Sequence, residues 1–165
     1  MADPIPANEA LAAWRRIPGE IEAAIEGVPE SGLGWRGGDD GMSIRETVHH
    51  LVEANLVAAS IMIAALGKTG CVYDWSWLFP NLEWTQRMGY ERVPIGPALA
   101  TLRALVEHVG GVIAASDGLG REVRLRDSPG AALYTKTVED ILLQEAEHAA
   151  EHLRGLAQTR AAQGA

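Results

Sequence analysis

Hydrophobic residues recur at three- and four-residue spacing in four long segments of the chain, which is the pattern of amphipathic helices. The approximate ranges of these segments are 11–28, 43–66, 97–117 and 137–158. In the first segment Pro18 and Gly19 interrupt the pattern, so we expect a kink or a break into two helices there. Four amphipathic helices of this length most simply form a four-helix bundle. The expected fold class is therefore all-α.

Two of the expected helices begin with capping signals. Ser43 and Glu46 form a capping box, in which serine and glutamate each bond the other's backbone N–H. Thr137 and Asp140 form a weaker version of the same motif. The helix after Ser43 is apolar around most of its circumference, so we expect it at the centre of the bundle.

The connections between the helices are long and carry most of the aromatic residues. Residues 67–94 hold Trp75, Trp77 and Trp84, and this length suits a crossover that leaves the second and third helices parallel. A connection this long is uncommon unless it is functional. The three tryptophans either cap a metal and form a substrate pocket, or cover the end of the bundle as a small satellite core. In the next connection, residues 123–126 alternate in polarity and favour a short strand or hairpin.

Composition and charge narrow the class of protein. The 165 residues suit a single domain, residues 1–165. With 14 basic and 22 acidic residues, the net charge is −8 and no dense basic cluster exists, which disfavours nucleic acid as a partner. Cys71 is the only cysteine, so we expect a reducing cytoplasm. The longest uncharged stretch has 14 residues, shorter than the roughly 20 of a membrane span, so we expect no membrane partner.

Histidines supply the candidate chemistry. His148 and His152 lie four residues apart, so both imidazoles project from one helix face and suit one metal ion. On the second helix, His49 shares a polar sector with Glu53 and is expected to be solvated. His50 is flanked by small and apolar residues. It is therefore either a partly buried histidine bonded to a carbonyl, or a third ligand pointing towards the other two.

Short motifs along the chain resemble the DinB-like superfamily of bacterial metalloproteins. They are Trp35-Arg36, the helix start Ser43-Ile44-Arg45-Glu46 followed by His49-His50-Leu51, and the distant His148-x-x-x-His152-Leu153. In that family a Trp precedes a Ser-x-x-Glu helix start, a His-Leu pair follows, and a His-x-x-x-His pair lies on the last helix. The resemblance extends from Trp14 to Leu156, and its specificity comes from order and spacing together.

The resemblance implies a four-helix bundle of up-down-down-up topology, often a homodimer. It also implies one divalent transition metal held by His50, His148 and His152. A site of histidines alone does not distinguish Zn, Ni, Fe or Mn. Characterised relatives transfer low-molecular-weight thiols or use them in isomerisation, which implies a metal-dependent enzyme acting on a small molecule. The competing class is a non-enzymatic metal-binding or stress-response protein. Family members often have Gln or Glu soon after the last histidine. This chain has Leu153-Arg154-Gly155 at that place, so we assign it to no characterised subfamily.

Two other metal sites are compatible with the residues. A di-iron carboxylate bundle would use Glu46-x-x-His49 and Glu145-x-x-His148, with Glu22, Glu26 or Glu107 from the other helices. It would leave His50 and His152 without a role. A protease of the inverted zinc type would use His148-x-x-Glu151-His152, but needs a third ligand downstream, where no carboxylate or histidine follows.

Three further residues have open or minor roles. Glu145 lies on the face of His148 and His152, and is an acceptor that orients an imidazole, a fourth ligand or a surface ion-pair partner. Cys71 is expected to be structural or incidental. His108, beside Glu107, is expected to face solvent.

Overall fold

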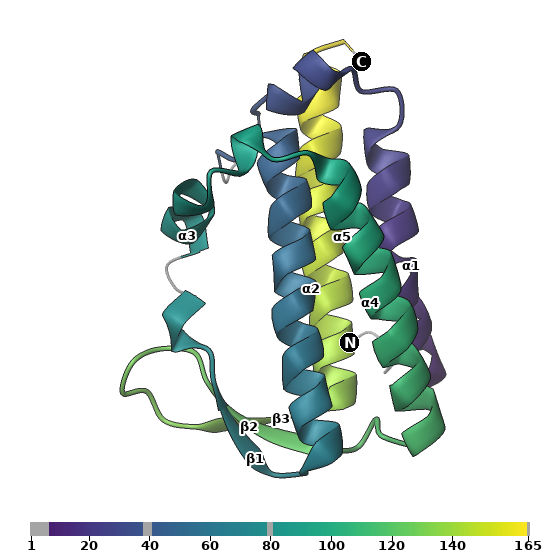
Figure 1. The fold of residues 1–165 in the computed structure, drawn as a ribbon, viewed down its shortest axis with the longest axis vertical. Coiled ribbons are helices and arrows are strands. Elements are labelled where there is room, and N and C mark those ends of the chain that lie inside the picture. Colours follow the sequence, from purple (N-terminus) through teal and green to yellow (C-terminus); the bar gives the residue numbers. More distant parts are fainter. Residues whose placement is uncertain (1–6, 38–40, 79–80, 165) are drawn as a thin grey trace, which may run out of the picture.

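Four long helices form the body of the molecule in the computed structural model, which describes residues 7–37, 41–78 and 81–164 (Figure 1). The helices are α1 (Ala7–Ile25), α2 (Ile44–Gly67), α4 (Ile95–Ser116) and α5 (Val138–Ala162). α1 packs chiefly on α5, and α2 packs on both α4 and α5. In Figure 1, α1 and α5 run from the lower end of the bundle to the upper end, whereas α2 and α4 run downwards. The prediction of a helical bundle is confirmed.

α1 is one helix, so of the kink or break expected at Pro18 the break is wrong. Its buried face continues on both sides of the proline, with Trp14, Ile17 and Ile21 fully buried. A proline inside a helix removes one backbone hydrogen bond and crowds the preceding turn. Burial of large side chains on both sides outweighs that local loss, so the bundle holds α1 together.

Both predicted capping boxes form. The Ser43 side chain accepts from the backbone N–H of Glu46, and Glu46 accepts from the backbone N–H of Ser43. The same reciprocal bonds join Thr137 and Asp140 at the start of α5. α5 continues past the predicted end near residue 158, because Thr159 is buried and Arg160 donates a 2.7 Å hydrogen bond to the Ala24 carbonyl.

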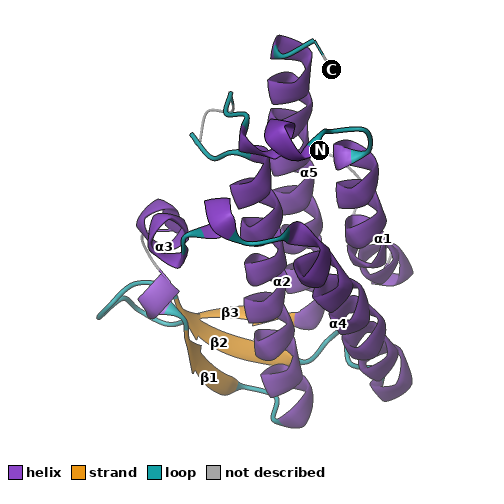
Figure 2. Ribbon diagram, turned by 45° about the horizontal axis from the view of Figure 1, so that its top comes forward, coloured by secondary structure: helices purple, strands orange, loops and turns teal. Residues whose placement is uncertain are grey.

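A small sheet at the lower end of the bundle corrects the expected all-α class (Figure 2). Its strands are β1 (Cys71–Asp74), β2 (Glu122–Arg126) and β3 (Tyr134–Thr137). β2 and β3 form the antiparallel hairpin that the alternation of residues 123–126 favours, and β1 joins β2 in parallel. Val123 and Leu125 are buried against the bundle, so the sheet is part of the same core.

The crossover between α2 and α4 is structured and runs back beside α2. It begins with β1, continues through the short helix α3 (Asn81–Met88), and reaches α4 through a 3₁₀ turn, Tyr90–Arg92 (Figures 1 and 2). The apolar pattern did not indicate α3, because eight residues are too few for a clear helical period. This path carries the tryptophans of the crossover along the outer face of α2.

α2 and α4 are long and apolar enough, by length and composition, to cross a membrane. Core helices of bundles meet the same test. Here the two helices pack on each other, and α2 also carries a fully buried amide, Asn55. Asn55 accepts a 2.7 Å hydrogen bond from the Trp14 indole N–H and donates one of 2.8 Å to the Leu51 carbonyl. A polar bond therefore joins α1 to α2 within the core.

We expect Asn55→Leu to lower the free energy of unfolding by about 1–3 kcal/mol, because the Trp14 N–H would remain buried without an acceptor. Urea denaturation followed by circular dichroism measures this change. Adding Trp14→Phe to the Asn55→Leu chain removes the orphaned donor, so the double variant should lose less than the sum of the two single losses. Additive losses would show that the bond contributes nothing.

Candidate metal centre

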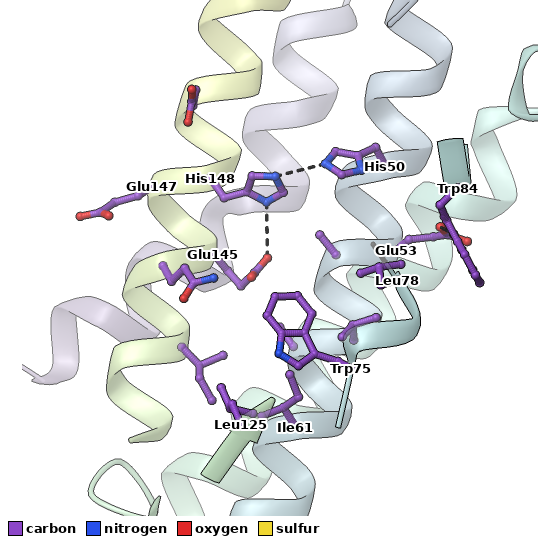
Figure 3. A pocket seen from close by; sticks show the side chains of 16 residues that line it. His50, Glu53, Ile61, Trp75, Leu78, Trp84, Leu125, Glu145, Glu147 and His148 are labelled. Atoms are coloured by element: carbon purple, nitrogen blue, oxygen red, sulfur yellow. Dashed lines mark hydrogen bonds and ion pairs between the residues drawn. The ribbon is translucent and has the colours of Figure 1, made fainter. Parts of the chain in front are cut away.

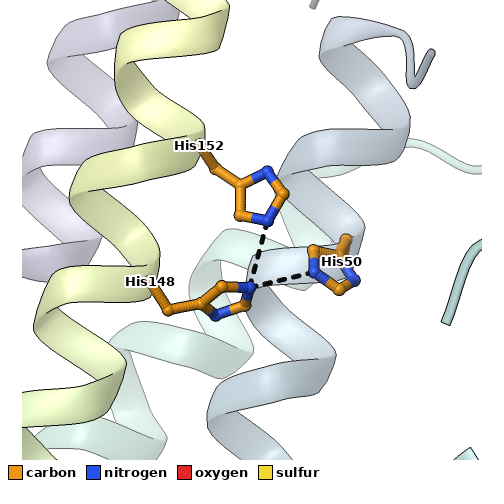
Figure 4. A group of neighbouring side chains, drawn as sticks. All are labelled: His50, His148 and His152. Carbon is orange, nitrogen blue, oxygen red and sulfur yellow. Dashed lines mark hydrogen bonds between the residues drawn. The ribbon is translucent and has the colours of Figure 1, made fainter. Parts of the chain in front are cut away.

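The structure brings together the three histidines that the family resemblance singles out (Figure 4). His148 and His152 project from consecutive turns of α5, and His50 faces them from α2. The Nε2 atom of His148 lies 3.2 Å from Nε2 of His50 and 3.0 Å from Nε2 of His152. All three side chains are partly buried.

These distances fit a metal centre. Imidazole nitrogens about 2.0–2.1 Å from one metal lie roughly 2.9–3.4 Å from each other, for bond angles between octahedral and tetrahedral values. Nε2 of His148 carries either one hydrogen or one lone pair, so it cannot form a full hydrogen bond with both neighbours. A cation placed among three lone pairs satisfies all of them. The donor set of three neutral imidazoles suits a divalent transition metal.

The environment of His50 keeps its imidazole neutral, which is the form that binds a metal. Burial, and then the nearby His148 and His152, lower the pKa of His50 to about 3. The His50 imidazole is therefore neutral at ordinary pH, and a metal has no proton to displace from it. The two neighbouring lone pairs are also favourable partners for a cation that all three rings share.

Of its three possible roles, Glu145 has that of an acceptor beside His148 that orients the imidazole ring. Its Oε2 atom lies 3.7 Å from Nδ1 of His148, on the side of the ring away from the converging Nε2 atoms. The carboxylate favours the tautomer with hydrogen on Nδ1, which leaves the Nε2 lone pair free for a metal. Glu145 is only 7 % exposed, so it is not a surface ion-pair partner.

His49 occupies a different environment from the one expected. It is buried, stacks on Tyr90 at 4.7 Å, and its Nε2 lies 3.1 Å from the Val93 carbonyl. A carbonyl only accepts, so His49 donates this hydrogen bond. The expected solvated His49 beside Glu53 is therefore wrong. Its role is to hold the last turn of the crossover against α2.

The residues of the di-iron alternative do not gather at one point. Among the residues that the structure describes, the one group of three or more candidate ligands is His50, His148 and His152. Glu46 is engaged at the start of α2 by the Ser43 N–H and by Arg36 at 2.7 Å. Burial alone would raise the pKa of Glu46, but these two partners hold it below its usual value. Glu46 is thus a structural carboxylate.

A cavity of about 370 Å³ opens beside the triad (Figure 3). His50 and His148 form part of its wall, together with Trp75, Leu78 and Trp84 of the crossover. Glu53 of α2 accepts a 2.7 Å hydrogen bond from the Trp84 indole and so ties α3 to the bundle. The structure thus favours the pocket-forming role for Trp75 and Trp84. Trp77 does not line the cavity and is 53 % exposed, with its ring against Trp84.

Comparison with known proteins decides the family. The sequence profile of the DinB superfamily matches residues 13–156. The chain belongs to the DinB superfamily. Its fold is similar to a solved structure described as "YfiT from Bacillus subtilis is a probable metal-dependent hydrolase with an unusual four-helix bundle topology". The TM-score is 0.83 at 16 % identity, over 99 % of this chain and 93 % of that one. No curated protein matches the sequence.

The remaining candidate residues of this DinB superfamily protein lie away from the centre. Cys71 starts β1 and is partly buried, and His108 is exposed on α4 as expected. From the sequence a pocket formed by the tryptophans was one of two alternatives, and its other walls were not predicted, because they come from α2, α5 and β2. The sequence places Trp75, Trp77 and Trp84 in one connection and does not distinguish them. The path of that connection in the structure puts Trp75 and Trp84 on the cavity wall and leaves Trp77 outside it.

Proposed function

We propose that this DinB superfamily protein is a metal-dependent enzyme that acts on a small molecule. The observation that carries the proposal is that His50 and His148 belong both to the triad and to the wall of the cavity. A cavity of about 370 Å³ is within the size range of small-molecule sites. A site that only stored a metal would need no such space beside it.

A divalent metal at the triad supplies Lewis-acid chemistry, which lowers the pKa of a bound water or thiol. His50, His148 and His152 would hold it, and three protein ligands leave coordination positions open. Trp75 and Trp84 would bound the substrate and limit access of bulk water. The description of YfiT supports hydrolysis, and the family resemblance supports transfer of a low-molecular-weight thiol. Both reactions need a nucleophile, a water or a thiol, beside the metal at the triad.

We expect thiols or small anions such as azide to change the visible spectrum of the Co(II)-loaded protein, because they would occupy open positions. Trp75→Ala should change the affinity for these ligands about tenfold at unchanged metal content, since the indole lines the approach to the site. Titration of the Co(II) absorption bands measures both effects.

Trp77→Ala is the matched control, because this indole lies outside the cavity wall, and it should bind ligands like the wild type. A wild-type spectrum that no small ligand alters would show a closed site. The enzyme proposal would then give way to a storage or structural role.

Three properties complete the proposal. We propose one metal per chain, because the three ligand nitrogens all lie within 4.8 Å of one another. We also propose that the chain forms a homodimer, as the family resemblance implies. The lone cysteine supports a cytoplasmic location, where thiols stay reduced.

A further inference from the structure

The charged side chains on the cavity wall are all acidic. They are Glu53, Glu145, Glu147 and Glu151, and none of the described residues lining the cavity is Lys or Arg. Glu147 and Glu151 are exposed at the rim, and Glu53 is bonded to Trp84. An anionic group placed in the cavity away from the metal would therefore meet repulsion from every charged side chain of the wall.

Glu145 differs from the other three carboxylates because it is buried and keeps an unused acceptor. Its Oε2 atom forms no hydrogen bond with any residue that the structure describes. Burying a carboxylate oxygen without a donor is costly. Figure 3 shows this carboxylate directed at His148, in a space also bounded by Trp75. The contact with His148 is at 3.7 Å, too long for a hydrogen bond, so a donor from a ligand has room to complete the site.

The rest of the wall is apolar and aromatic. Ile61, Leu125 and Ile141 line the part of the cavity farther along α2 and α5, and Trp75 and Trp84 line its sides. Indole rings attract both apolar groups and cations, the latter through the negative face of the ring. The cavity thus combines an apolar body with one buried acceptor that carries negative charge.

We propose that this cavity binds small molecules that pair an apolar or aromatic body with a protonated amine, and that Glu145 accepts the ammonium N–H. The inference rests on the proposed function in one respect, because it names the substrate class of the same cavity. The ammonium lies on the Nδ1 side of His148, and the imidazole ring separates it from the three Nε2 atoms. The amine is therefore a recognition group, not a metal ligand.

The test compares 2-phenylethylamine with 2-phenylethanol, which share the ring and the chain length and differ in charge at pH 7. Isothermal titration calorimetry on the metal-loaded full chain should give an affinity for the amine at least tenfold above that for the alcohol, as a charged hydrogen bond at a buried site implies. Equal affinities would overturn the proposal.

Glu145→Gln keeps the shape of the side chain and removes its charge, so it should abolish the preference for the amine. Glu107→Gln is the matched control on the exposed face of α4 and should retain the preference. Preference kept by a folded Glu145→Gln chain would contradict the assignment of Glu145. Circular dichroism checks that the variant folds. If it does not fold, the affinities of the wild type for 2-phenylethylamine and 2-phenylethanol still test the preference for the charged ligand.

His152→Ala separates this inference from the proposed function. His152 belongs to the triad but does not line the cavity, so its removal weakens the metal site and leaves the wall intact. The tenfold preference for the amine should persist in this variant. Its loss there would show that the amine binds the metal, and would overturn the role of Glu145. A preference that persists while no metal-dependent activity is found would instead contradict the proposed function alone.

Discussion

His148→Ala should reduce the affinity of the chain for a divalent transition metal by about two to three orders of magnitude. Complete structural zinc sites with four ligands bind with about 10–16 kcal/mol, or roughly 2.5–4 kcal/mol per ligand. The effect should be largest at His148, because its Nε2 contacts the Nε2 atoms of both other histidines. Elemental analysis after dialysis, and competition with a chromophoric chelator, measure content and affinity.

His108→Ala is the matched control, since it removes an exposed histidine of α4 that lies outside the triad. The control and the wild type should both hold about one metal per chain. A ratio near two metals per chain, or binding that survives the double change His50→Ala and His152→Ala, would favour the di-iron site and contradict the triad.

Between pH 6.5 and 5, the metal-free protein should lose up to about 1.4 kcal/mol of its free energy of unfolding for each unit that the pH falls. The pKa of His50 is about 3 in the folded chain, because of burial and the two neighbouring histidines, against 6.5 as its usual value. Below pH 6.5 the unfolded chain therefore binds a proton that folded His50 does not, and unfolding becomes more favourable. The buried helices should still keep the metal-free chain folded at neutral pH.

Urea denaturation at several pH values measures this slope. His50→Gln removes one titrating ring and should make the dependence shallower, leaving the part due to His49, whose pKa burial also lowers, whereas His108→Gln should leave the dependence as in the wild type. The window lies above the ordinary pKa values, 4.5 for Glu and 3.8 for Asp, of the carboxylates whose pKa is lowered, which are Glu46, Asp74 and Asp140. Their stabilising effect is lost as the pH falls below those values. Identical slopes for the wild type and His50→Gln would show that His50 is as easily protonated in the folded chain as in the unfolded one.

Local patterns were informative where the physical cause is local. The capping boxes at Ser43 and Thr137 need only residues three apart, and both form at the predicted starts. The spacing of His148 and His152 places both rings on one helix face for the same reason. The third histidine, His50 on α2, could not be assigned from local pattern alone. The residues around it allowed two interpretations, and the family resemblance favoured the metal ligand. The structure then brings its Nε2 within 3.2 Å of His148.

Other features depend on contacts between distant segments, and the sequence predicted them poorly. Pro18 predicts a kink or a break, and packing of the flanking buried side chains excludes the break by keeping α1 one helix. β1 is a strand because β2 offers it a partner about fifty residues away. His49 was expected among solvated carboxylates, but Tyr90 and Val93 cover it once the crossover returns along α2.

The sequence by itself determined the four long helices, the start of two of them, and the resemblance to the DinB superfamily, whose profile matches residues 13–156. The helices and their starts follow from hydrophobic periodicity and short-range hydrogen bonds, which depend only on residues close together in the sequence. Tertiary structure alone decided the cavity, the burial of Glu145 with an open acceptor, and the separation of Trp75 from Trp77. Each of these depends on which surfaces meet when α2, α5, the sheet and the crossover pack. Burial and charge environment are properties of that packing, and no spacing along a single helix encodes them.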